Sequence, residues 1–170
     1  IFHEDLNLIE QICKKLSRTV IANINSYNQI IISGPIDEID KSIELFKENN
    51  IKKIIKLNVS GAFHSPLMKE ANVSLNKVIN SVNFIDTKIP IYQNVSPREN
   101  FEGKKIKDNL LQQLTGSVLW YQTVLNMEKN GIDKIIELGP KKVLSKLVAK
   151  ITPNIQVNSI DNMKDLEQWI

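Results

Sequence analysis

The chain has 170 residues, a formal net charge of +3, 42% apolar residues and 24% charged residues. These values are typical of a folded globular protein with one domain or two small subdomains, and they exclude a disordered segment. The charge is far from the basic footprint of a nucleic-acid-binding protein. No apolar run has the length of a membrane span, so we expect a soluble protein.

The single cysteine, Cys13, excludes an internal disulfide. It falls on the apolar stripe of a predicted helix, which indicates a buried core thiol. One cysteine and two histidines are too few to build a structural zinc site.

The first third of the chain predicts a small α+β layer. Residues 5–17 have helical periodicity, and a second helix begins at Pro35, where proline suits the first helical position. Three strands are expected at 19–25, 29–33 and 51–59. This order favours a helix packed on an antiparallel sheet, with a boundary near residue 58.

The remainder alternates between helices and strands, which favours a parallel α/β sheet of which only part is present. A helix starting at Pro66 is expected to bury Leu75, Val78, Ile79 and Val82. The other expected elements are strands at 89–92, 134–138 and 155–159, and helices at 105–115, 118–130 and after Gly139-Pro140. Trp120 and Trp169 are expected to be packing residues.

His64 is the main candidate for chemistry. Ser65 and Pro66 follow it and form a good N-cap and first-turn pair, so His64 should lie just before a helix. The positive end of the helix dipole disfavours the imidazolium, and a neutral histidine can act as a general base. A histidine in such a place is more often a surface or packing residue, so this pattern alone leaves both interpretations open.

Five stretches of sequence, in order, resemble the motifs of one enzyme family. The stretch Asn-Val-Ser-Gly-Ala-Phe-His-Ser-Pro-Leu-Met (58–68) resembles the histidine motif of malonyl-CoA:acyl carrier protein transacylases. The others are Ala-Asn-Ile-Asn-Ser-Tyr-Asn-Gln-Ile-Ile-Ile-Ser-Gly (22–34), Pro-Ile-Tyr-Gln-Asn-Val-Ser (90–96), Leu-Leu-Gln-Gln-Leu-Thr-Gly-Ser-Val-Leu-Trp (110–120) and Glu-Leu-Gly-Pro-Lys-Lys-Val-Leu-Ser (137–145). The resemblance covers nearly the whole chain and identifies His64 as the catalytic base.

The sequence departs from the family pattern at loop positions. Tyr27 and Asn28 stand where the family has Pro-Gly, Ser117 replaces a proline, and Lys141 replaces the last glycine of Gly-Pro-Gly. These differences concern the local backbone shape more than the fold.

The resemblance implies an α/β fold with a partial α/β-hydrolase-like parallel sheet and a small ferredoxin-like α+β subdomain. Residues 1–17 would then be a helix of the large subdomain, 18–58 the ferredoxin-like subdomain, and 59–170 the C-terminal part of the large acyltransferase subdomain.

The family transfers a malonyl group from coenzyme A to acyl carrier protein, through an acyl-serine formed on a Gly-x-Ser-x-Gly elbow. No two of the six glycines are four residues apart, so this elbow is absent from the sequence. The family's N-terminal glutamine loop and its malonyl-binding arginine are absent too. We therefore expect a C-terminal portion that is inactive alone, with the missing N-terminal part as a partner.

The resemblance also implies roles for three further residues. A main-chain carbonyl, expected from Gln113, orients His64, while the side chain of Gln113 is as well explained as a surface amide. Asn25 would line the acyl pocket, although turn formation alone also explains it. Phe63 would fill space beside the malonyl Cα and disfavour an α-methyl branch by about 1–3 kcal/mol.

The implied substrates are malonyl-CoA and acyl carrier protein, with no cofactor, no metal, no nucleic acid and no membrane. A lysine cluster is a candidate surface for the acidic carrier protein or simply a solvated helix face: Lys141, Lys142, Lys146 and Lys150. The expected compartment is a bacterial cytoplasm or the matrix of a plastid or mitochondrion. Two alternatives stay open: an acyltransferase domain from a polyketide or fatty acid synthase, and a non-catalytic fragment that binds the carrier protein.

Overall fold

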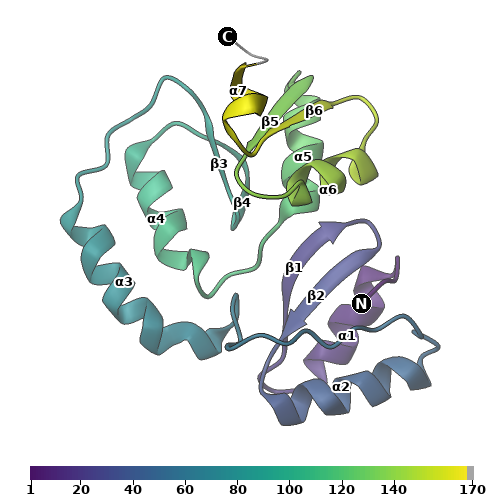
Figure 1. Cartoon of the computed structure of the whole chain (residues 1–170). Coiled ribbons are helices and arrows are strands. Elements are labelled where there is room, and N and C mark those ends of the chain that lie inside the picture. The colour runs from purple at the N-terminus through teal and green to yellow at the C-terminus, as the bar shows by residue number, and fades with distance from the viewer. Residues whose placement is uncertain (168–170) are drawn as a thin grey trace. The chain divides into compact units, whose positions relative to one another are not determined.

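The structure is a computed structural model that describes residues 1–167. It divides into two compact units, Ile1–Thr123 and a second unit that begins at Val124 (Figure 1). Both units combine helices and strands, so the expected α/β class is confirmed. Each unit is described by itself.

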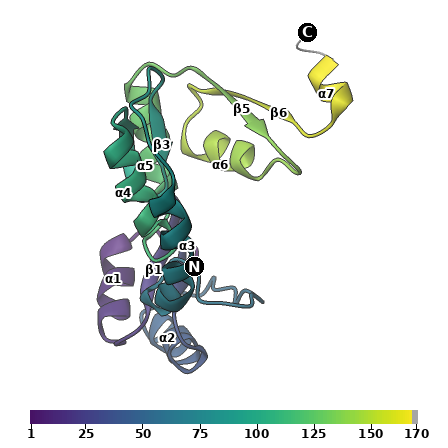
Figure 2. The ribbon, with the colours of Figure 1, turned by 90° about the vertical axis from the view of Figure 1, so that its left-hand side faces the viewer.

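The first unit begins with the expected small layer. Helix α1 (Leu6–Lys14), strands β1 (Val20–Ser26) and β2 (Gln29–Ser33), and helix α2 (Ile36–Glu48) follow one another. The two strands pair antiparallel, and both views show the two helices beside β1 (Figure 1, Figure 2). Apolar side chains of all four elements form one core: Ile9, Ile12, Cys13, Ile24, Ile30, Phe46 and Ile51.

Cys13 is buried in this core, as its place on the apolar stripe predicted. Burial raises the pKa of its thiol to about 11, with a smaller contribution from Glu10. The thiol therefore stays protonated near neutral pH and has no nucleophilic character.

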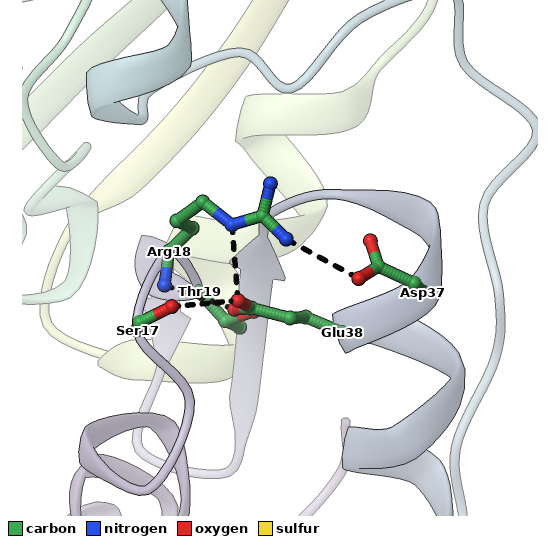
Figure 3. Close-up of polar contacts among 5 residues, drawn as sticks. All are labelled: Ser17, Arg18, Thr19, Asp37 and Glu38. Carbon is green, nitrogen blue, oxygen red and sulfur yellow. Dashed lines mark hydrogen bonds and ion pairs between the residues drawn. The ribbon is translucent and has the colours of Figure 1, made fainter.

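A buried carboxylate ties the start of α2 to the turn before β1 (Figure 3). Glu38 accepts hydrogen bonds from the hydroxyls of Ser17 and Thr19 at 3.0 and 2.9 Å, and from the backbone and Nε of Arg18 at 2.9 and 3.1 Å. Burial alone would raise the pKa of Glu38, but these hydrogen bonds outweigh it and lower the pKa to about 2. Arg18 also reaches Asp37 at 3.2 Å.

The expected third strand at 51–59 is not formed. Ile51 donates to Phe46 at 2.9 Å, and Lys53 accepts from Phe2 at 3.0 Å. No backbone hydrogen bond to or from residues 54–61 is found among the described residues. The prediction of a strand was wrong because no neighbouring strand in this part of the chain pairs with the segment. In Figure 1 the segment is a coil between α2 and α3 (Lys69–Ser81).

The helix expected at Pro66 begins as a 3₁₀ turn, Pro66–Met68, and continues as α3 (Lys69–Ser81). Its expected burial is largely wrong. Ile79 is buried, whereas Leu75, Val78 and Val82 are 41, 62 and 50% exposed. The cause is that α3 packs on α4 (Gly103–Gln113) along one side only, and no described residue covers its outer apolar side.

The first unit ends with a short hairpin, a helix and the first residues of a further helix that continues into the second unit. Strands β3 (Ile91–Gln93) and β4 (Ser96–Asn100) pair antiparallel, and helices α4 (Gly103–Gln113) and α5 (Trp120–Lys129) follow. Strand β4 was not predicted from the sequence because it is polar and contains a proline, and both features are unusual in a strand. Trp120 is half-buried, and Trp169 lies outside the described residues.

The second unit contains β5 (Lys134–Leu138), α6 (Val143–Ile151), β6 (Gln156–Ile160) and α7 (Met163–Glu167). Strands β5 and β6 pair parallel, which confirms the predicted parallel β-α-β arrangement. The carboxylate of Glu137 at the end of β5 accepts from the backbone of Leu144 and Ser145 at 3.0 and 2.8 Å. Burial raises the pKa of Glu137, and hydrogen bonds from Ser145 and the α6 backbone reverse this and lower it.

Among residues 1–167 no helix is both long and apolar enough to cross a membrane. In the same residues, no group of three or more His, Cys, Asp or Glu side chains is arranged to hold a metal ion.

Candidate functional site

The backbone at His64 is locally strained. Its φ is +58°, in the left-handed region that non-glycine residues rarely occupy, at a cost of about 1–3 kcal/mol. The next residue, Ser65, caps the 3₁₀ turn as predicted: its hydroxyl accepts from Leu67 N at 3.3 Å and donates to Ala62 O at 2.6 Å. This cap fixes the loop directly beside the imidazole.

Two main-chain carbonyls hold the imidazole of His64. Its Nδ1 lies 3.1 Å from the carbonyl oxygen of Gln113 and 3.2 Å from that of Gly116. Because carbonyl oxygens only accept, Nδ1 must carry the proton and donate it. The lone pair is then on Nε2, which is the atom able to take a proton from a substrate or nucleophile.

The expected contact between His64 and the Gln113 carbonyl is therefore present. The backbone N–H of His64 adds a third link, to the carbonyl of Leu114 at 3.2 Å. The carbonyls of Gly116 and Leu114 were not anticipated, because main-chain acceptors leave no signature in the side-chain pattern.

The loop that carries these carbonyls is bound to the edge of β1. Val118 donates to Ala22 O at 2.8 Å, and Ile24 donates to Val118 O at 2.9 Å. Ser117, which stands where the resemblance expects proline, donates its hydroxyl to Ile21 O at 2.6 Å. A proline has no such hydroxyl, so this substitution adds a side-chain tie between the loop and the sheet. The orientation of His64 is thus set through a strand 40 residues earlier in the chain.

A groove of about 870 Å³ runs from the histidine loop along β2 and α2. His64 and Phe63 both line it, and Phe63 is 44% exposed. Asn25 lies on β1 and is half-buried, but it is not one of the groove residues; Asn23, two positions earlier, is. The structure therefore brings His64, Phe63 and the Gln113 carbonyl together, and it does not bring Asn25 into the groove.

Lys141 occupies the position where the resemblance expects glycine. Its φ is +72°, so the backbone keeps the left-handed conformation that glycine favours despite the side chain. The four lysines proposed for carrier-protein contact, Lys141, Lys142, Lys146 and Lys150, are all exposed. Exposure fits both of the interpretations given above.

The chain is similar in sequence to known proteins that share one name. No protein-family model matches the chain. The malonyl CoA-acyl carrier protein transacylase of Staphylococcus aureus is 36% identical over 169 residues, covering 97% of this chain and 55% of that protein.

The solved structures that this chain resembles have names similar to those of its sequence relatives. The malonyl-CoA:ACP transacylase of Synechocystis superposes with a TM-score of 0.87 at 31% identity, covering 98% of this chain and 56% of that one. A malonyl-transacylase solved in complex with its type II PKS acyl-carrier protein superposes with a TM-score of 0.90 at 26% identity, covering 99% and 55%. This chain is therefore a relative of the malonyl CoA-acyl carrier protein transacylases along nearly its whole length, and it spans about half the length of the relatives that it matches.

Proposed function

We propose that this chain is the C-terminal part of an acyltransferase that moves a malonyl group from coenzyme A to acyl carrier protein in fatty acid biosynthesis. The observation that carries the proposal is the geometry of His64, held by two carbonyls with Nε2 left as the basic atom, in a chain whose relatives have this activity by name. The nucleophilic serine belongs to polypeptide outside this chain.

His64 acts as the base of a serine–histidine dyad. Nε2 takes the hydroxyl proton of the serine as its oxygen attacks the thioester carbonyl, and returns the proton to the departing CoA sulfur. In the second half-reaction Nε2 takes the proton from the carrier protein's thiol as its sulfur attacks the acyl-serine carbonyl. The acyl–oxygen bond then breaks and Nε2 returns the proton to the departing serine oxygen, which leaves a malonyl thioester on the carrier protein. Gln113 and Gly116 position the ring by accepting from Nδ1. No cofactor takes part.

Phe63 and Asn25 have supporting roles in this proposal. Phe63 lines the groove next to His64, where its ring disfavours an α-methyl branch on the acyl group by about 1–3 kcal/mol. Asn25 contributes a hydrogen bond to the acyl pocket once the rest of the protein is in place. The carrier protein meets the lysines around α6, and the reaction takes place in a bacterial cytoplasm or an organelle matrix.

The finer architecture is also part of the proposal. Helix α2 with β1 and β2 belongs to a small ferredoxin-like subdomain at 18–58, and α1, within 1–17, is a helix of the large subdomain that leads into it. The parallel pair β5–β6 belongs to an α/β-hydrolase-like sheet, with 59–170 as its C-terminal part. The helix–sheet layer and the parallel β-α-β unit support this division.

The direct test uses the full-length protein that contains this chain. His64→Ala should lower malonyl transfer to acyl carrier protein by about 10²–10⁴-fold, the contribution typical of a general base, with an unchanged circular dichroism spectrum. The matched control is His3→Ala, because His3 is the other histidine and does not line the groove. Equal rates for the two variants would remove His64 from the mechanism.

A second measurement separates catalysis from binding alone. The isolated chain should not become labelled by radioactive malonyl-CoA, because it lacks the serine elbow. Stoichiometric labelling would reveal a nucleophile within these 170 residues and contradict the assignment. A full-length protein that binds acyl carrier protein but transfers nothing would favour the non-catalytic alternative.

A further inference from the structure

The C-terminal end of helix α4 is the place to which the histidine loop is attached. The last carbonyls of a helix have no donor within the helix, so they need partners from elsewhere. In the turn that follows α4, Gly116 N donates to Gln112 O at 2.8 Å. His64 satisfies the next two carbonyls, Gln113 O through Nδ1 at 3.1 Å and Leu114 O through its backbone N–H at 3.2 Å. The position of the acceptors that orient the imidazole therefore depends on where this helix ends.

A further carbonyl at this end, that of Leu111, is held by a side chain from the helix that follows the histidine loop. Asn72 lies on α3, and its Nδ2 donates to Leu111 O at 3.0 Å. Among the described residues this is the hydrogen bond that joins α3 to α4, and the two helices otherwise meet by packing (Figure 1). The segment that carries the imidazole is thus bonded to the end of α4 at two places, His64 and Asn72.

The histidine loop receives its support from the residues that follow it. Residues 54–61, which precede it, make no backbone hydrogen bond within the described part of the chain. The φ of His64 is +58°, an unfavourable value that the surroundings have to impose. The contacts that can impose it are the Ser65 cap and α3, which Asn72 fixes on α4.

The amide of Asn72 is only half satisfied. Its Oδ1 is buried and has no hydrogen-bond partner among the described residues. A buried acceptor without a partner costs stability, and an apolar side chain of similar size would avoid that cost. An amide can instead fix the register of two helices, as a single buried asparagine does in a coiled coil. The direction in which Asn72 donates therefore matters more than the stability that it adds.

Asn76 provides a comparison on the same helix. It lies one turn after Asn72 on the same face of α3, it is also half-buried, and its Oδ1 is likewise buried without a partner. No hydrogen bond from Asn76 to α4 is found in the part of the chain that the structure describes. The two asparagines share a similar environment, and Asn72 alone of the pair reaches the carbonyls beside the imidazole.

We propose that Asn72 is a positioning residue for His64. Its hydrogen bond to Leu111 O keeps the carbonyls of Gln113 and Gly116 within reach of Nδ1. Without that bond α3 and α4 can shift against each other, and Nδ1 loses its acceptors. The neutral ring can then exchange its Nδ1 proton with water and carry one on Nε2 instead, which removes the lone pair that serves as the base. The effect on rate rests on the proposed function, whereas the effect on the ring proton does not.

The test uses the full-length protein that contains this chain. Asn72→Leu keeps the approximate size and removes the amide, Asn72→Asp keeps the shape and replaces the donor with a carboxylate that only accepts, and Asn76→Leu is the matched control. The ¹⁵N chemical shifts of the ring nitrogens, assigned by the signals that His64→Ala removes, report which nitrogen of the neutral ring carries the proton. The proton should be on Nδ1 in the wild type and in Asn76→Leu, and both variants of Asn72 should lose this preference.

The rate of malonyl transfer to acyl carrier protein gives a second readout. The kcat of Asn72→Leu should fall about tenfold, because a misplaced base slows proton transfer. Asn72 does not line the groove, so the KM for malonyl-CoA should stay close to that of the wild type. The Tm should change little, since the buried Oδ1 is lost together with the donor. Asn76→Leu should keep the wild-type kcat.

The outcomes separate this proposal from the proposed function. Wild-type ring-nitrogen shifts in either variant of Asn72 would overturn the proposal, and so would equal effects of Asn72→Leu and Asn76→Leu, because packing of α3 would then be the cause. A changed ring proton with an unchanged rate would support the positioning role and contradict the role of His64 in transfer. A normal rate in His64→Ala would contradict the proposed function alone, because the ring proton of His64 is measured without turnover.

Discussion

Helices α2 and α3 are both 13 residues long and both carry an apolar stripe, but they bury it to very different extents. Phe46 of α2 is fully buried against α1, β1 and β2, all of which precede α2 by fewer than 40 residues. On α3, Ile79 is buried and Val78 beside it is 62% exposed. The difference teaches that a periodic pattern predicts a helix, whereas burial needs a partner that is present in the same chain.

The apolar surfaces that stay exposed in this chain agree with its shorter length relative to known proteins. The exposed side of α3 and the segment 54–59 are apolar, as surfaces that are covered in a complete protein tend to be. The chain spans about 55% of the length of its relative from S. aureus. The α1–β1–β2–α2 layer therefore buries an apolar core among its own elements, while α3 keeps one apolar side exposed in the described part of the chain.

The largest effect is expected in the core of the small layer. Phe46→Ala should lower the free energy of unfolding by about 3–5 kcal/mol, because it removes a fully buried ring and leaves a cavity. Urea denaturation monitored by circular dichroism measures the loss. A loss below about 1 kcal/mol would mean that this layer is not the stabilising core.

A smaller effect is expected at the carboxylate that joins α2 to the turn before β1. Glu38→Gln should lower Tm by several degrees, because a neutral amide cannot replace the charge-assisted hydrogen bonds from Arg18, Ser17 and Thr19. The matched control is Asp37→Asn, which removes an exposed ion pair and should change Tm little.

The stabilisation that Glu38 provides should depend on pH in a definite direction. The folded-state pKa of Glu38 is about 2, below the ordinary value of 4.5. A lowered carboxyl pKa stabilises the fold fully above the ordinary value, and the contribution is lost as pH falls from about 4.5 toward 2. As the pH is lowered from about 4.5 toward 2, the Tm of the wild type should approach the Tm of Glu38→Gln. A difference between the two Tm values that stays constant over this range would show that the charge of Glu38 does not stabilise the fold.

The smallest effect is expected on the exposed side of α3. Val78→Ser in this chain should change the free energy of unfolding by no more than about 0.5 kcal/mol, because the side chain is already in water. Its neighbour Ile79→Ala is the control and should cost about 2 kcal/mol or more. In the full-length protein Val78→Ser should become costly, and equal effects in both lengths would mean that nothing covers α3.

Much of the secondary structure was predictable because its causes are local. The strands at 29–33 and 134–138 match the prediction residue for residue, and the helix ends at Asn49 and Ser65 follow from capping chemistry. Helix α2 begins at Ile36, one residue after the expected start at Pro35. The strand at 51–59 was predicted wrongly for a non-local reason, since a strand exists only when a neighbour accepts its hydrogen bonds. Strand β4 shows the converse, because pairing with β3 makes a strand of a polar, proline-containing sequence.

By itself, the sequence determined most of the helices and strands, the capped loop before α3 and the identity of the candidate base, His64. Caps, turns and periodicities depend on residues within a few positions of one another, so they can be found without a fold. Only the tertiary structure decided that β1 holds the loop of Gly116 and Val118, and that this loop fixes the proton on Nδ1 of His64. Main-chain carbonyls exist at every residue, and only folding selects the two that face the imidazole.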